Sequence, residues 1–253
     1  MKFFAPAGQY DPCGMFTLTH LFALFGCLLI VTVLLIITRH WNHHQVKRII
    51  RILAVVLSII EVGKIIFNFF YGYTGLDNWL PLYFCSLFLY ALWMAGFGNR
   101  KIANIGLGYL FGAGFVCGLA FLVVPSTSFT TYPLFHFLSS YSMLFHSAMC
   151  FIGIQIVITG YYQPKWRNIR YYITFCSIFI TLALVINFVF HVNMMFLMKP
   201  YKIPILLILY NLSPLLYTSL MVIGHATLPF IVTYGGYFFI AKIPPQIILK
   251  GNK

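Results

Sequence analysis

The chain has 253 residues, of which 61% are hydrophobic and only 8% are charged. Because so little polar surface cannot cover a soluble globule, a water-soluble enzyme is excluded and a polytopic membrane protein is predicted. The formal charge of +13 would suggest a nucleic-acid partner for a soluble protein. Here most basic residues fall in short loops between hydrophobic runs, so they indicate membrane topology and we expect no nucleic-acid partner.

Hydrophobic runs predict an all-α fold with seven transmembrane helices in a single domain, residues 1–253. The first run begins near Met15 and continues without a small-residue cleavage site, which indicates a spanning helix and not a removed signal peptide. A short apolar piece at 203–210 cannot span and is expected at the membrane interface. The predicted membrane helices cover about 15–38, 49–71, 80–97, 103–124, 134–159, 170–190 and 214–241.

The basic residues orient these helices. Of the sixteen Lys and Arg, twelve fall in alternate loops and the C-terminal tail, three (Lys2, Lys199 and Lys202) fall on the other side, and Lys64 lies within a helix. By the positive-inside rule, the N-terminus is expected outside and the C-terminus inside. Glycine pairs at 108/112 and 114/118 in the helix at 103–124 have the small-xxx-small spacing that favours close helix packing.

The stretch Leu80-Pro81-Leu82-Tyr83-Phe84-Cys85 places a thiol about one turn inside the predicted helix at 80–97. A cysteine nucleophile needs a base to take its proton and a third group to orient that base. The candidate bases are His146 and His20, and Glu61 is the buried acid available to orient the imidazole. Cys85 is equally explained as a packed thiol.

Each polar partner has a simpler explanation as well. Glu61 and Lys64 lie three residues apart on one helix face and can neutralise each other. His146 can hydrogen-bond a backbone carbonyl or Ser142 one turn earlier, and His20 and His136 can be interfacial polar residues. Several histidines plus Glu61 also allow a zinc hydrolase, but no His-x-x-x-His pair is present, so we expect neither a metal nor another cofactor.

Several stretches resemble a known family. They are Phe16-Thr17-Leu18-Thr19-His20, Glu61, Leu80 to Cys85, His146 after Tyr132-Pro133-Leu134-Phe135, and Asn193-Met194-Met195-Phe196-Leu197-Met198-Lys199-Pro200. Together they resemble the YwaF-like bacterial membrane proteins, which are similar to the transmembrane protein 164 acyltransferases. The resemblance implies a seven-helix lipid acyltransferase in the bacterial cell membrane, in which Cys85 carries the acyl group as a thioester and His146 is the base. Met194 stands where the family often has Tyr.

The hypothesis is therefore a transacylase that takes an acyl chain from a membrane phospholipid and passes it to a hydroxyl or amine acceptor. Lys199 and Lys202 are expected to bind a headgroup phosphate. Asn193, His136 and Lys64 are further candidates for substrate binding. The alternatives are a transporter or lipid-binding membrane protein that uses the same polar groups without covalent chemistry, and a structural protein with a satisfied polar core.

Overall fold

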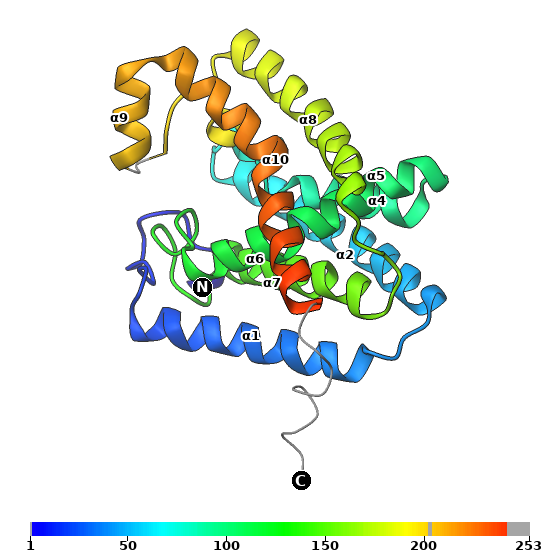
Figure 1. Cartoon of the computed structure of the whole chain (residues 1–253). Helices are drawn as coiled ribbons and strands as arrows, with labels where there is room; N and C mark the ends of the chain where they lie inside the picture. Colours follow the sequence, from blue (N-terminus) through cyan, green and yellow to red (C-terminus); the bar gives the residue numbers. More distant parts are fainter. Residues whose placement is uncertain (1, 202–203, 242–253) are drawn as a thin grey trace.

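The computed structural model describes residues 2–201 and 204–241, and the part it describes is built from helices without strands (Figure 1). This confirms the all-α fold for the described residues. The longer helices are α1 (Leu18–Thr38), α2 (His43–Phe70), α4 (Leu87–Phe97), α5 (Arg100–Gly112), α6 (Gly114–Val123), α7 (Phe137–Ile158), α8 (Ile169–Phe190), α9 (Pro204–Leu212) and α10 (Pro214–Ala241). The short ones are α3 (Leu76–Trp79) and the 3₁₀ turns η1 (Lys2–Phe4), η2 (Trp166–Asn168) and η3 (Met194–Phe196).

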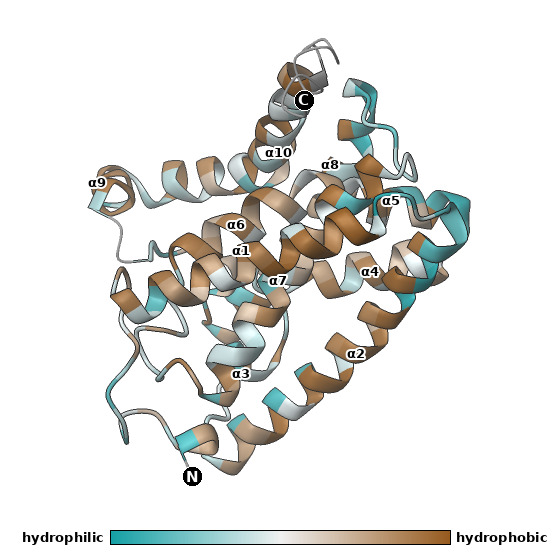
Figure 2. Cartoon of the chain, turned by 90° about the horizontal axis from the view of Figure 1, so that it is seen from below, coloured by the Kyte–Doolittle hydropathy of each residue, from teal (hydrophilic) through white to brown (hydrophobic). Residues whose placement is uncertain are grey.

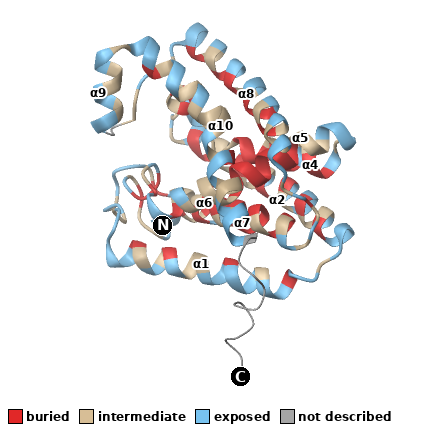
Figure 3. Ribbon diagram, viewed as in Figure 1, coloured by how far each residue is buried: buried red, intermediate tan, exposed pale blue. Residues whose placement is uncertain are grey.

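Five helical stretches are long and apolar enough to cross a membrane: α1, α5 with α6, α7, α8 and α10. Their outer faces expose large apolar side chains, among them Phe22 on α1 and Phe188 on α8, each 76% exposed. Brown, hydrophobic residues cover much of these helices in Figure 2, and the buried residues gather where the helices meet in Figure 3. Since apolar side chains on this scale belong against lipid, the chain is a multi-pass membrane protein.

Two predicted helices differ from the observed ones near the candidate nucleophile. The helix expected at 80–97 begins only at Leu87, because Pro81 has no N–H and biases Leu80 towards the extended conformation that it adopts (φ −81°, ψ 116°). The helix expected at 103–124 is divided at Ala113 into α5 and α6. The prediction that Cys85 lies one turn inside a helix was therefore wrong: it lies in the irregular segment before α4.

The start of α2 also differs, since the helix begins at His43 and not near residue 49. Asn42 accepts a hydrogen bond from the backbone N–H of Gln45, and the Gln45 side chain accepts one from the N–H of Asn42. This reciprocal capping box satisfies two amides at the helix end. It allows the helix to begin among polar residues that hydropathy alone excludes.

The predicted close packing at the glycines is confirmed. α6 packs along α7 so closely that a Cβ on Gly118 would lie 2.8 Å from both the carbonyl oxygen of His146 and the Sγ of Cys150. Gly114 similarly faces Gly153, with 3.2 Å between a Cβ on Gly114 and the Cα of Gly153. These contacts hold the part of α7 that carries His146 against α6.

A buried loop after α8 carries the Asn-x-Met-Phe-Leu pattern. Met195 and Phe196 have φ angles of 55° and 53°, in the left-handed region that such residues rarely adopt. Asn187 holds the loop by accepting a hydrogen bond from the Met194 N–H at 2.6 Å and donating one to the Met194 carbonyl at 3.1 Å. Tyr217 on α10 donates to the Phe196 carbonyl at 2.6 Å. Strained backbone of this kind persists only where its surroundings fix it.

We expect Gly118→Ala to destabilise the fold, because backbone atoms on α7 occupy the position of the added methyl group and cannot rotate away. The expected loss is about 1–3 kcal/mol, typical of overpacking. Thermal unfolding in detergent measures it, with Gly26→Ala on α1 as the matched control, since a Cβ there meets nothing within 4 Å. Equal unfolding temperatures for the two variants would contradict the close approach of α6 and α7.

Candidate functional site

A cavity of about 660 Å³ collects ionisable and nucleophilic side chains from elements far apart in the sequence. It is bounded by α2, α7 and α10, the segment before α4, the loop before α7, and η3. The acidic, basic and thiol side chains that line it are Glu61, Lys64, Asp77, Cys85, His146 and His225. The predicted nucleophile, its predicted base and the predicted acid therefore share one cavity.

Cys85 reaches this cavity because the chain is not helical between α3 and α4. The Tyr109 hydroxyl on α5 donates a hydrogen bond to the Phe84 carbonyl, which also accepts a long one, 3.3 Å, from the Leu87 N–H. Leu82, only 2% exposed, anchors the segment in the core. Cys85 itself is a free, half-buried thiol. An unconstrained thiol near a cavity wall is placed to act as a nucleophile if a base can reach it.

His146 has the hydrogen-bonding pattern of a neutral base. Its Nδ1 lies 2.7 Å from the Ser142 carbonyl oxygen, which can only accept, so Nδ1 carries the proton and Nε2 has the lone pair. The ring stacks on Phe121 with centroids 3.6 Å apart and planes 9° apart. Nε2 is buried without a hydrogen-bond partner. An orphaned, buried lone pair in a native structure calls for a functional explanation.

No hydrogen bond joins the Cys85 Sγ to either cavity histidine among the described residues. Proton transfer in this arrangement therefore needs a closure of the cavity or a bridging molecule. Catalytic hydrogen bonds are often long in the absence of substrate and shorten when it binds.

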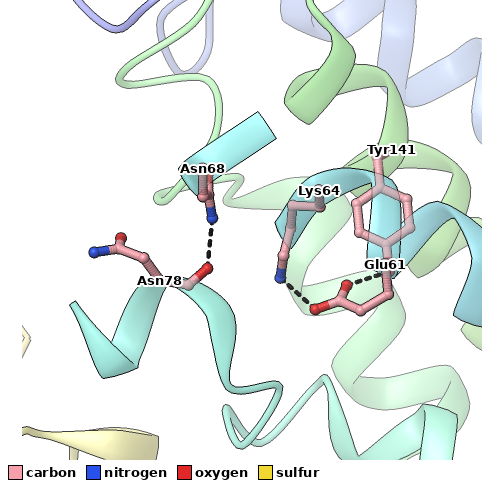
Figure 4. Close-up of polar contacts among 5 residues, drawn as sticks. All are labelled: Glu61, Lys64, Asn68, Asn78 and Tyr141. Carbon is pink, nitrogen blue, oxygen red and sulfur yellow. Dashed lines mark hydrogen bonds and ion pairs between the residues drawn. The ribbon is translucent and has the colours of Figure 1, made fainter. Parts of the chain in front are cut away.

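Glu61 is held by two partners other than a histidine (Figure 4). Its carboxylate forms an ion pair with Lys64 at 2.6 Å and accepts a hydrogen bond from the Tyr141 hydroxyl at 2.6 Å. The sequence-based alternative that Glu61 neutralises Lys64 is thus confirmed. The predicted contact with His146 is not among the hydrogen bonds of the described residues, and Oε2 of Glu61 accepts from Tyr141, on the same helix as His146.

Two of the histidines predicted for the site lie elsewhere. His20 has its Nε2 2.9 Å from the Leu122 carbonyl, and its Nδ1 accepts from the Phe16 N–H at 3.0 Å. His136 caps α7 through Nδ1, while its Nε2 lies 2.9 Å from the Ala5 carbonyl. Burial lowers the pKa of His136, which keeps it neutral for this capping role, and the bond to Ala5 only partly opposes the shift.

Because both nitrogens of each ring bind backbone groups, and neither ring lines the cavity, His20 and His136 hold loops to helices. The structure does not bring them together with Cys85. The orienting role predicted for His20 and the substrate-binding role predicted for His136 are therefore corrected to backbone-holding roles.

Of the other predicted binding residues, Lys64 lines the cavity, whereas Asn193 and Lys199 are not among its lining residues. The Asn193 side chain accepts from the N–H of Lys199 at 3.1 Å and donates to its carbonyl at 2.8 Å, so it shapes a turn. Lys199 is exposed beside that turn. Lys202 lies outside the described residues. From the same motif it is Met195 and Phe196, not the predicted polar residues, that line the cavity.

Three further features of the cavity were not among the predicted site residues. His225 on α10 and Tyr141 on α7 line the cavity, as does a run of hydroxyl side chains at Ser126, Thr127, Ser128, Thr130 and Thr131. The density of hydroxyl residues at 126–131 is visible in the sequence, and so is Pro229, a proline inside a predicted membrane helix four residues after His225. Within 2–201 and 204–241 no three His, Cys, Asp or Glu side chains lie close enough to bind a metal, so the zinc alternative has no ligand set there.

We expect Glu61→Gln to lower the unfolding temperature in detergent, because it leaves the Lys64 ammonium without its countercharge beside an apolar core. Removing one partner of a buried ion pair typically costs about 3–5 kcal/mol. The double variant Glu61→Gln/Lys64→Met should recover much of that loss. A single variant as stable as the wild type would show that the ion pair is solvated and contributes little to stability.

Comparison with known proteins agrees with this arrangement. The family model described as the TMEM164 family matches residues 15–234, which include every helix from α1 to α9 and all the cavity residues named above. No curated protein and no solved structure matches the chain. Since the family model covers most of its length, the chain belongs to the TMEM164 family.

Proposed function

We propose that the protein is a membrane-embedded lipid acyltransferase in which Cys85 carries the acyl group and His146 is its general base. The observation that supports this most is the cavity that joins a free thiol to a histidine whose buried Nε2 has no partner. Membership of the TMEM164 family supports it further, because the sequence resemblance to that family implies a cysteine nucleophile and a histidine base. Membrane phospholipid is the proposed acyl donor.

In the first half-reaction the Cys85 proton moves to Nε2 of His146, and the thiolate attacks the ester carbonyl of the donor lipid. The carbon–oxygen bond breaks, and the departing alkoxide takes the proton from the imidazolium. The products are a thioester on Cys85 and a lysophospholipid. Phe121 and the Ser142 carbonyl keep Nε2 in the lone-pair form for this step.

The lining of the cavity suits an amphipathic substrate. Phe121, Phe145 and Met195 supply an apolar wall, and Lys64 and the hydroxyl side chains of 126–131 supply a polar one. We place the acyl chain along the first and the headgroup near the second. Lys199 is exposed, and the Asn193 side chain holds its backbone in place. We propose that Lys199 and Lys202 bind headgroup phosphates at the membrane surface.

The proposal includes seven membrane crossings in one domain, with the N-terminus outside and the C-terminus inside a bacterial cell membrane. α2 would cross with Glu61 and Lys64 neutralising each other, and the α3–α4 segment would cross as a broken helix. Irregular backbone at membrane depth is tolerated where it lines a cavity and its polar groups are satisfied. The Phe84 carbonyl meets that condition through Tyr109.

Intact-protein mass spectrometry tests the thioester. Purified protein is incubated with vesicles of phosphatidylglycerol and phosphatidylethanolamine and then treated with neutral hydroxylamine. We expect a hydroxylamine-labile acyl adduct on the wild type and on the control Cys27→Ala, and none on Cys85→Ala, since the acyl group has lost its attachment atom. A folded wild type that never acquires an adduct would favour a cavity that only binds lipid.

His146→Gln should slow formation of the adduct by about 10²–10⁴-fold, the usual contribution of a general base. The glutamine can still pack against Phe121 but offers no basic nitrogen. Time-resolved mass spectrometry at saturating lipid measures the rate, with the exposed His44→Gln as the matched control. Acylation of His146→Gln at the control rate would remove His146 from the mechanism.

A further inference from the structure

His225 has the same hydrogen-bonding pattern as His146 but lies on a different helix that lines the same cavity. Its Nδ1 lies 2.7 Å from the Met221 carbonyl oxygen, so Nδ1 carries the proton and Nε2 has the lone pair. Its ring packs edge-on against Phe84, the neighbour of Cys85, with centroids 4.6 Å apart. Two neutral imidazoles with free Nε2 atoms therefore line one cavity with a thiol.

The backbone carbonyl of His225 has an unusual hydrogen-bond partner. Pro229 lies inside α10 and has no N–H, so the carbonyl four residues earlier, that of His225, loses its helical hydrogen bond. The Tyr172 hydroxyl on α8 supplies the missing donor at 2.9 Å. Pro229 and Tyr172 together fix the helix at His225. A residue that only packs in the core does not need this support.

A neighbouring contact also positions the segment that carries Cys85. Tyr172 lies parallel to Tyr109, with centroids 6.0 Å apart and planes 8° apart. Tyr109 in turn donates to the Phe84 carbonyl. Adjacent tyrosines thus position His225 and the Cys85 segment. The two are also in direct contact, because the Phe84 ring packs on the His225 ring.

His146 and His225 differ in how far their side chains are exposed. His146 is 6% exposed and its Nε2 is buried, whereas His225 is only partly buried. A buried base suits the thiol, which is already inside the protein. A more open base suits a substrate that enters after the first product has left.

We propose that His225 is the general base for the acceptor, an inference that rests on the proposed acyltransferase function. In the second half-reaction the acceptor hydroxyl gives its proton to Nε2 of His225 as its oxygen attacks the thioester carbonyl. The carbon–oxygen bond forms, the carbon–sulfur bond breaks, and the departing Cys85 thiolate takes up that proton. The cycle then returns both histidines to their neutral forms.

The test separates the two half-reactions in His225→Gln. The protein is acylated with dioleoylphosphatidylglycerol vesicles and then offered lysophosphatidylglycerol, or, in a parallel sample, hydroxylamine. Neutral hydroxylamine is a strong nucleophile that needs no base. We expect the acyl adduct to form at the wild-type rate and to be released normally by hydroxylamine, but to pass to lysophosphatidylglycerol about 10²-fold or more slowly.

Tyr172→Phe removes only the hydroxyl that holds the His225 carbonyl, so it should slow the lysophospholipid step several-fold and leave acylation unchanged. His44→Gln serves as the control. Wild-type transfer to lysophosphatidylglycerol by His225→Gln overturns the inference, as does loss of adduct formation in that variant. A wild type that forms no adduct overturns the proposed function itself, so the two failures are distinguishable.

Discussion

Backbone groups within a membrane need hydrogen-bond partners inside the protein, and this constraint governs the centre of the molecule. The cavity lies where the chain leaves helical geometry before α4 and at η3, and where Pro229 removes one hydrogen bond from the continuous helix α10. At each place a tyrosine hydroxyl from a neighbouring helix donates to a backbone carbonyl. Tyr109 binds Phe84, Tyr172 binds His225, and Tyr217 binds Phe196.

The same need for backbone partners explains why four histidines of this structure divide into two groups. His20 and His136 have both ring nitrogens engaged with backbone groups and act as connectors. His146 and His225 use only Nδ1, towards a carbonyl of their own helix, and keep Nε2 free. The number of free nitrogens, more than depth in the membrane, distinguishes a candidate base from a structural histidine.

Of the seven membrane helices that hydropathy predicted, five are found as stretches that are long and apolar enough to cross a membrane, because an apolar run of that length has few alternatives. Cys85, His146 and Glu61, which the sequence analysis proposed as nucleophile, base and acid, line one cavity. The broken helix at Pro81 was missed, although Pro81 itself is the signal. His20 and His136 were misassigned because sequence gives the depth of a side chain along its helix, whereas its direction around the helix depends on packing.

The account depends on a lipid acyl chain entering the cavity with its ester next to Cys85. The most direct measurement is a structure of the Cys85→Ser variant prepared with phospholipid in a nanodisc. We predict an acyl chain along Phe121 and Phe145, with the ester carbonyl carbon within about 3.5 Å of the side-chain oxygen at position 85, the separation of a reactive pose. Lipid bound only to the outer surface, with water alone in the cavity, would contradict the account.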